Sequence, residues 1–417
     1  MLFGVPWSAR SLNGLTLGSL LGLVGCVMLD AGAPAFTVSG LELAVPGGRE
    51  PNLDATSDGR VVMSWWEMTG DRSHALKVAV RSGGAWSEAR TVVEGDQFFV
   101  NWADFPSVLE LPGGSWVTHW LQKTAASTYA YHVKLAISQD KGATWSAPVT
   151  PHRDASPTEH GFVSMVPWQG GAGVIWLDGR AMAGGEMASG GDHDMPAGSM
   201  TIRFTTVTTD GSLGEDLLLD ERTCECCQTA LAATTNGLVA AYRDRSEAEI
   251  RNIAITRLVD GRWTEPQPVA DDKWHYPGCP VNGPSLSASG DTVALAWFTA
   301  PEQLPKIYVA FSIDAGATWT APIRVDDGKP LGRVDIELLA DGSALVSWLQ
   351  ATERAEIRAR RVRRNGKVDP SWLVTETSEA RASGFPRMAR VGDEIVFAWT
   401  EVGEKGGVRV ATATPRR

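Results

Sequence analysis

Residues 106–120 read Pro-Ser-Val-Leu-Glu-Leu-Pro-Gly-Gly-Ser-Trp-Val-Thr-His-Trp, two short apolar runs on either side of a Pro-Gly-Gly turn. Valine and aromatic residues favour strands, and a glycine-rich turn between two such runs predicts an antiparallel hairpin. A third strand is expected at 132–137 and a fourth at 147–149, after a tight turn at 138–145. This stretch therefore predicts a small four-stranded antiparallel sheet.

The same unit recurs along the chain. The second strand of each copy ends in a bulky aromatic residue, and these residues follow one another at intervals of 51 to 66 positions: Trp65, Trp120, Trp176, Tyr242, Trp297, Trp348 and Trp399. No helical periodicity intervenes, and each interval suits one four-stranded blade. We predict an all-β fold, a seven-bladed β-propeller of four-stranded antiparallel blades.

The two ends of the chain predict how the ring closes. The last repeat finishes with a third strand at 407–412 and has no fourth strand after it, whereas residues 41–45 form an apolar strand before the first repeat. We expect the N-terminal strand to complete blade seven, because this pairing removes a free sheet edge.

One turn occurs in two good copies, Ser138-Gln139-Asp140-Lys141-Gly142-Ala143-Thr144-Trp145 and Ser312-Ile313-Asp314-Ala315-Gly316-Ala317-Thr318-Trp319. In such a turn the Asp carboxylate accepts backbone N–H bonds, Gly allows a positive φ and Trp fills the space between sheets. The pattern resembles the Asp-box, or BNR repeat, of the bacterial sialidase-like propellers. The resemblance implies a structural turn on the face away from the active site, so we expect no catalytic role for Asp140 or Asp314.

The composition excludes some classes of function. The chain has 417 residues, 43% hydrophobic and 21% charged, with 17 Trp, enough for one large core. Its net charge is −11, and its basic residues form no extended run beyond the short stretch from 358 to 364. Nucleic acid is therefore not expected as a partner.

The N-terminus predicts export and lipidation. An apolar run at 15–24 is too short for a permanent membrane helix and ends in Leu23-Val24-Gly25-Cys26, which resembles a bacterial lipobox. We expect residues 1–25 to be a lipoprotein signal peptide, with Cys26 lipidated, 26–39 a tether and 40–417 the propeller. Because Val27 is not Asp, the sorting pattern favours the outer membrane and the periplasm of a bacterium.

Polar residues stand two positions beyond each repeat aromatic, on the same side of the strand. One explanation is that strands simply become solvated at their ends; the alternative is an acidic ring that faces a ligand or a cation. The seven positions include Thr299, and the residues expected on this ligand face are Glu67, Gln122, Asp178, Asp244, Gln350 and Glu401.

Blade four departs from the repeat, because a cysteine-rich segment replaces the usual proline before its first strand. Cys224, Cys226 and Cys227 lie there, and Cys279 lies in the equivalent loop of the next blade. Equivalent loops share one face, so we expect the four thiols to meet. Three states remain open: disulfides, a copper or zinc site with His275 or a loop histidine as a further ligand, and a redox-active thiol site.

A long insertion in blade three, after Asp178, is expected on the same face. It carries four Met, together with His193, which are soft or borderline metal ligands that suit copper. A solvated glycine-rich loop with incidental Met explains the same residues.

A sialidase would need a catalytic set that the sequence supplies only in part. Sialidase-like hydrolases use three arginines to hold a carboxylate, a Tyr–Glu nucleophile pair and an Asp acid/base, and an Arg-Ile-Pro motif that is absent here. The residues available for such a site are Asp178, Asp244, Tyr242, Tyr276, Arg180, Arg243, Arg245, Arg333 and Arg387. Two arginines flank Asp244, which predicts an ionised carboxylate in a structural cluster.

These patterns predict a lipid-anchored cell-envelope propeller whose Cys, His and Met residues bind copper, zinc or a small ligand. The alternative is an exo-sialidase, another glycoside hydrolase or a glycan-binding protein. Expected partners are the membrane, through the lipid anchor, a metal ion, glycan or other small ligand, and a protein bound to the propeller face.

Overall fold

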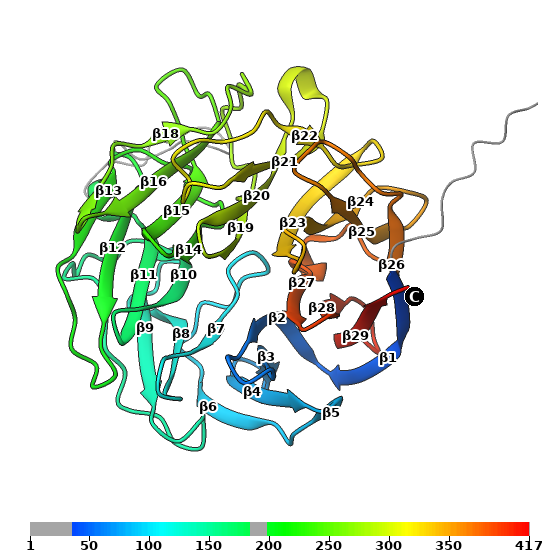
Figure 1. Ribbon diagram of the computed structural model, residues 1–417. Helices are drawn as coiled ribbons and strands as arrows, with labels where there is room; N and C mark the ends of the chain where they lie inside the picture. The colour runs from blue at the N-terminus through cyan, green and yellow to red at the C-terminus, as the bar shows by residue number, and fades with distance from the viewer. Residues whose placement is uncertain (1–35, 184–197, 417) are drawn as a thin grey trace, which may run out of the picture. The chain divides into compact units, whose positions relative to one another are not determined.

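The computed structural model describes residues 36–183 and 198–416, which form seven antiparallel sheets arranged as propeller blades (Figure 1). The predicted fold is confirmed. Among the described residues the helices are three short 3-10 turns, η1 (Arg180–Met182), η2 (Pro301–Gln303) and η3 (Arg381–Ser383). No helix in this part of the chain has the length and apolarity needed to cross a membrane.

Successive strands of each blade run outward from the axis (Figure 1). Blade 1 contains β2 (Gly48–Ala55), β3 (Val61–Met68), β4 (His74–Ser82), β5 (Ala85–Trp86) and β6 (Arg90–Gly95). Blade 2 contains β7 (Ser107–Glu110), β8 (Trp116–Lys123) and β9 (Tyr131–Ser138), and a single bridge between Leu135 and Val149 stands at its predicted fourth strand. Blade 3 contains β10 (His160–Trp168), β11 (Gly171–Asp178), β12 (Thr201–Val207) and β13 (Leu217–Asp220).

The remaining blades follow the same order. Blade 4 contains β14 (Ala230–Thr234), β15 (Gly237–Arg243), β16 (Ile253–Val259), β17 (Arg262–Trp263) and β18 (Gln267–Pro268). Blade 5 contains β19 (Ser285–Ser289), β20 (Thr292–Thr299), β21 (Lys306–Ser312) and β22 (Ile323–Arg324). Blade 6 contains β23 (Pro330–Leu338), β24 (Ala344–Gln350), β25 (Ala355–Val362) and β26 (Trp372–Thr377). Blade 7 contains β27 (Arg387–Val391), β28 (Glu394–Glu401), β29 (Gly407–Pro415) and β1 (Phe36–Pro46).

The ring closes as predicted, because β1 pairs antiparallel with β29 as the outermost strand of blade seven. Val45 lies opposite Val408, and the pairing extends to Phe36 opposite Pro415. The strand thus begins four residues before the expected propeller boundary at residue 40. The reason is local packing: Phe36 is 4% exposed and stacks on Trp372, with ring centroids 5.8 Å apart.

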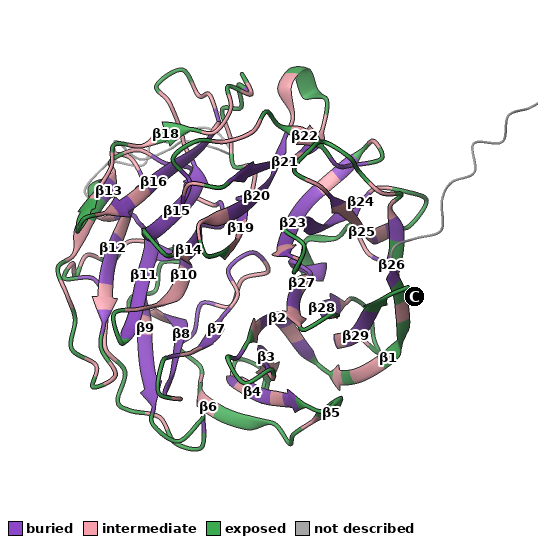
Figure 2. Cartoon of the chain, in the orientation of Figure 1, coloured by how far each residue is buried: buried purple, intermediate pink, exposed green. Residues whose placement is uncertain are grey.

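The repeat aromatics hold neighbouring blades together. All seven are buried, none more than 4% exposed, and Trp176 of blade 3 packs in one cluster with Val117 of blade 2. Burial of one large aromatic side chain stabilises a fold by about 2–3 kcal/mol. Figure 2 shows the buried residues concentrated along the strands and the exposed residues in the loops and outer strands.

The Asp-box turns have the expected structural role. In the first copy Asp140 accepts hydrogen bonds from the Thr144 backbone N–H at 2.8 Å and from the Thr144 hydroxyl at 2.7 Å. These bonds lower the pKa of Asp140 to about 2. Gly142 has φ +79°, and a Cβ there would lie 2.8 Å from the Trp116 ring, so both conformation and space require glycine.

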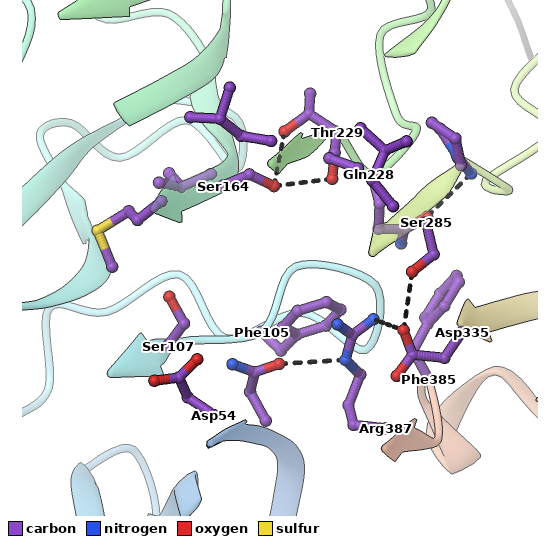
Figure 3. A pocket seen from close by; sticks show the side chains of 18 of the residues that line it. Asp54, Phe105, Ser107, Ser164, Gln228, Thr229, Ser285, Asp335, Phe385 and Arg387 are labelled. Carbon is purple, nitrogen blue, oxygen red and sulfur yellow. Dashed lines mark hydrogen bonds and ion pairs between the residues drawn. The ribbon is translucent and has the colours of Figure 1, made fainter. Parts of the chain in front are cut away.

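Hydrogen bonds between first strands tie the blades together around an axial channel of about 280 Å³ (Figure 3). Asp335 of blade 6 accepts from the Ser285 hydroxyl at 2.8 Å and from the Met388 backbone at 2.7 Å, so it joins blades 5, 6 and 7. Arg387 donates in turn to Asn52 of blade 1 at 3.1 Å. The polar groups that line the channel are therefore largely occupied by contacts between blades.

Candidate functional site

The ligand face is the face on which the first and third strands of each blade begin. Its centre is filled by the protein's own loop before β7. Trp102 of this loop stacks on Phe385 at 5.8 Å between centroids, and the Arg333 guanidinium lies 5.0 Å from the Trp102 ring. Gln228 donates to the carbonyl of Ala103 at 2.7 Å. A ligand over the axis would have to displace this loop.

Four of the polar residues beyond the repeat aromatics have a structural explanation. Each of these four lies two residues further along the same strand face, where it accepts a hydrogen bond from the buried indole N–H. The bonds are Trp120 to Gln122 at 3.3 Å, Trp176 to Asp178 at 2.8 Å, Trp348 to Gln350 at 2.9 Å and Trp399 to Glu401 at 3.4 Å. In blade 1 the Trp65 N–H has no partner among the described residues, so Glu67 does not serve it.

The five candidate arginines are all engaged within the protein. Three pair with carboxylates: Arg180 with Asp178, Arg245 with Glu249 and Arg387 with Asp335. The other two, Arg243 and Arg333, donate to backbone carbonyls. No free set of three arginines is left among these five to hold a ligand carboxylate.

The two candidate tyrosines lie in different environments. Tyr242 is 1% exposed and donates to Asp220 at 2.6 Å, and burial raises its pKa far above the ordinary value. Tyr276 is 39% exposed and packs on Trp274, with ring centroids 5.4 Å apart. Tyr242 is therefore committed to packing, as expected from its place in the repeat.

Asp244 holds its proton more strongly than an ordinary aspartate, although its carboxyl is still mostly ionised at neutral pH. Burial, followed by repulsion from Asp220, raises the pKa of Asp244 to about 6. The flanking arginines do not offset this, because Arg243 donates to backbone carbonyls and Arg245 pairs with Glu249.

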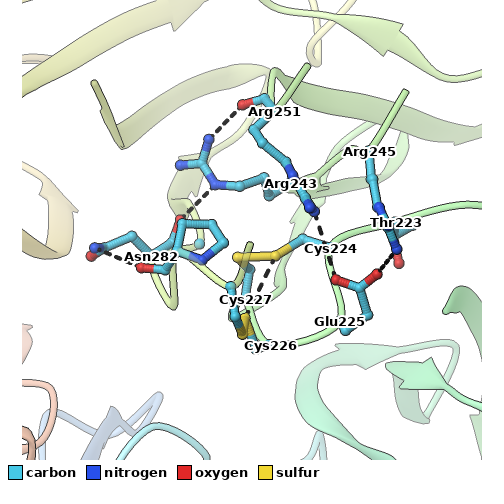
Figure 4. Close-up of a disulfide and its surroundings, with 12 residues drawn as sticks. Thr223, Cys224, Glu225, Cys226, Cys227, Arg243, Arg245, Arg251 and Asn282 are labelled. Atoms are coloured by element: carbon cyan, nitrogen blue, oxygen red, sulfur yellow. Dashed lines mark hydrogen bonds and ion pairs between the residues drawn. A yellow bond between two sulfur atoms is a disulfide. The ribbon is translucent and has the colours of Figure 1, made fainter. Parts of the chain in front are cut away.

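The four cysteines meet on the ligand face, and their sulfur atoms pair as two disulfides, Cys224–Cys227 and Cys226–Cys279 (Figure 4). The second disulfide joins the loops before blades 4 and 5. Of the three open states, the structure therefore has the disulfide state. His275 is exposed on the loop of Cys279, whereas His193 and Met195 of the blade-three insertion, like Cys26, lie outside the described residues.

A buried charge cluster supports the cysteine loop (Figure 4). Arg245 pairs with Glu225 and with Glu249, and Arg251, 1% exposed, lies 2.7 Å from Glu249. The fully buried Arg243 donates to backbone carbonyls and to no carboxylate, and burial lowers its pKa to about 9. The cluster holds the cysteine loop in place.

Three histidines between blades 2 and 3 form a cluster that we did not predict from the sequence. His132 begins the third strand of blade 2, His152 lies in the loop that leads to blade 3, and His160 begins β10. A parallel bridge between Tyr131 and Glu159, the residues before two of them, holds these strand ends side by side. One ring nitrogen of each histidine lies within 4.8 Å of one on each of the others.

Each imidazole of this cluster uses one nitrogen to hold its orientation. His132 Nε2 lies 3.1 Å from the Ser156 carbonyl, His152 Nδ1 3.0 Å from the Asp154 carbonyl, and His160 Nδ1 3.2 Å from the Tyr131 carbonyl. A carbonyl only accepts, so these nitrogens carry the protons, and in the neutral rings of His132 and His152 the opposite nitrogens have lone pairs. His160 also lies 3.1 Å from Asp154 Oδ2 through Nε2, so this nitrogen donates to the carboxylate and has to lose that proton to bind a metal. His152 Nε2 is buried and has no partner among the described residues.

Carboxylates complete the cluster. Asp154 Oδ2 lies 3.1 Å and Asp178 Oδ1 3.7 Å from His160 Nε2. Burial has the largest single effect on Asp178 and would raise its pKa, but the hydrogen bonds from Arg180 and Trp176 and the charges of His160 and Arg180 together outweigh it and hold the pKa below its usual range. Burial, with repulsion between the rings, lowers the pKa of His152 to about 3. The site thus combines three imidazoles with two carboxylates, which is the donor set of zinc and copper sites.

The sequence contained a signal for this cluster. It has seven His, and three of them fall between positions 132 and 160, at strand ends that the repeat places on the ligand face.

Comparison with known proteins supports the fold. No family model matches the chain, and no curated protein matches it in sequence. Among solved structures, a protein of unknown function from Dyadobacter fermentans is 14% identical, with a TM-score of 0.53 over 92% of this chain and all of that one.

Two sialidases are also among the similar structures. The NanB sialidase of Streptococcus pneumoniae is 14% identical over 91% of this chain and 70% of its own, with a TM-score of 0.44. The leech intramolecular trans-sialidase is 13% identical over 89% and 68%, with a TM-score of 0.45. Identities this low say nothing of function in this chain, and the seven-bladed propeller is established by its own sheet topology.

Proposed function

We propose that this protein is an exported, lipid-anchored propeller that binds one divalent transition metal ion, zinc or copper, on its ligand face. The ligands are His132, His152 and His160, with the carboxylate of Asp154 in the fourth position. The lipobox at Cys26 supports the location, and the histidine cluster supports the metal.

The observation that carries the proposal is the pairing of one nitrogen of each imidazole with a backbone carbonyl. Such second-shell bonds fix the tautomer and aim the other nitrogen at the metal. The unpartnered Nε2 of His152, on a side chain 4% exposed, is costly to bury unless something binds it. In a tetrahedral site the ligand nitrogens lie about 3.3 Å apart, so the rings need to close by at most about 1.5 Å.

Thiolate ligation has less support than imidazole ligation, because all four cysteine sulfurs are paired with each other. The sialidase alternative also has less support. Its candidate arginines are engaged, and the centre of the ligand face is filled by Trp102.

The test is metal binding by the folded protein and two matched variants. Wild type loaded with Zn²⁺ or Cu²⁺ and desalted should retain about one ion, measured by mass spectrometry of the metal. His152→Ala should lose at least 10-fold in affinity, as expected for a lost ligand, with an unchanged circular dichroism spectrum. His275→Ala, beside the cysteines, should bind as wild type does.

The proposal would be contradicted if His152→Ala retained the metal and His275→Ala lost it. That result would indicate a metal site at the cysteine loops instead. No retained metal in the folded wild-type protein would contradict metal binding altogether.

A further inference from the structure

The two disulfides differ in their access to solvent. Cys224 and Cys227 are each 1% exposed, so their disulfide is an inner pair. Cys279 is exposed and Cys226 is half-buried. We call the disulfide between them the outer pair, because an external thiol can reach it. Exposed disulfides exchange with thiols more readily than buried ones, because the attacking thiolate needs access to sulfur.

The inner and outer pairs are also in contact. The Sγ atoms of Cys224 and Cys226, which belong to different disulfides, lie 3.9 Å apart. A thiolate formed at Cys226 would therefore adjoin the sulfur of Cys224 without any movement of the loop. Two disulfides that only hold loops together do not require contact between their sulfur atoms.

We propose that the four cysteines form a thiol–disulfide exchange centre that accepts two electrons from a dithiol, such as an exported protein with two neighbouring Cys thiols. One substrate thiolate attacks Cys279 Sγ, forms a mixed disulfide and releases Cys226 as a thiolate. The second substrate thiol attacks the substrate sulfur of that mixed disulfide, forms the substrate disulfide and releases Cys279. The two thiol protons of the substrate end on Cys226 and Cys279, so the substrate is oxidised and the outer pair is reduced.

Exchange then passes the free thiol inward, from Cys226 to Cys227. The Cys226 thiolate attacks Cys224 Sγ, the Cys224–Cys226 bond forms, and Cys227 leaves as a thiolate that takes up the proton lost by Cys226. This step involves no net oxidation. It is independent of the proposed metal site, which shares no residue with the cysteine loops.

Limiting dithiothreitol tests the exchange in the unaltered protein. After acid quench and alkylation, chains that have lost one disulfide should carry one label at Cys279. The second label should be at Cys226 in some chains and, in a measurable fraction, at Cys227. Label confined to Cys226 and Cys279 at all reaction times, or an outer disulfide that resists dithiothreitol, would overturn the proposal.

Cys279→Ser tests the inward step without a reductant. The variant leaves one thiol, and peptide mapping at pH 8 should find it at Cys226 in some chains and at Cys227 in others. A thiol that stays at Cys226 after prolonged incubation would contradict the relay, even if the variant is less stable. The metal content of this variant should equal that of wild type. The metal-site proposal and the disulfide-exchange proposal are therefore tested independently.

Discussion

At the residue scale, the residue two positions after a repeat aromatic makes sense as an acceptor for a buried N–H. Gln350 shows this most clearly: its carbonyl accepts from Trp348 at 2.9 Å, and its amide donates to the Gly328 carbonyl. The sequence shows that these positions are polar, but not why. Strand periodicity predicts the side of the strand on which a residue lies, but not the atom with which its side chain makes a hydrogen bond.

Gln350→Leu should lower the free energy of unfolding by about 1–3 kcal/mol, because it leaves the buried Trp348 N–H without a partner. Denaturant unfolding measures the loss. Trp348→Phe combined with Gln350→Leu should cost less than the sum of the two single changes, since both polar groups are then removed. Additive losses would show that the hydrogen bond does not matter.

Buried carboxyl groups give the protein a distinct pH dependence. Burial raises the pKa of Glu50 to about 8, and Glu50 Oε2 has no partner among the described residues. A raised pKa means that the folded state binds more protons than the unfolded state between about pH 4.5 and 8. The contribution of Glu50 to stability is therefore full below about pH 4.5 and is lost as the pH rises through 8.

Glu50→Gln should stabilise the protein at pH 8.5 by about 1–3 kcal/mol relative to wild type and have little effect at pH 5, because glutamine carries no charge to desolvate. Thermal unfolding at the two pH values tests this. Equal effects at both would contradict the assignment of a neutral Glu50 carboxyl.

At the scale of elements, the repeat could be predicted, whereas the sequence only signals the histidine cluster, through three His between positions 132 and 160. Each blade is a local pattern of hairpins, so the spacing of Trp65, Trp120 and the later aromatics sufficed. His132 and His160 come together through one bridge between blades, which no local pattern encodes. The convergence of the cysteines was predictable because Cys279 occupies the loop equivalent to that of Cys226.

The outer disulfide should stabilise the junction between blades 4 and 5. Cys226–Cys279 spans 53 positions of sequence, and loss of such a cross-link costs about 2–4 kcal/mol. The double variant Cys226→Ser/Cys279→Ser should show this loss in denaturant unfolding. The control is wild type with both disulfides intact, and an unchanged stability would mean that the charge cluster alone holds the loops.

At the scale of the whole propeller, β1 is the element on which closure depends. It covers the edge of β29, which would otherwise expose a row of unpaired backbone groups. Removal of residues 36–46 should therefore lower the unfolding midpoint and cause self-association, measured by thermal unfolding and size-exclusion chromatography. A chain starting at Ala33 is the control, and a stable monomer without β1 would contradict this account of closure.

The central claim is that three histidines between blades 2 and 3 bind a transition metal. The most direct measurement is anomalous X-ray scattering at the zinc or copper absorption edge from crystals loaded with that metal. We predict one strong peak about 2.0–2.1 Å from a ring nitrogen of each of His132, His152 and His160. A peak at the cysteine loops beside His275, or none in fully loaded crystals, would contradict the claim.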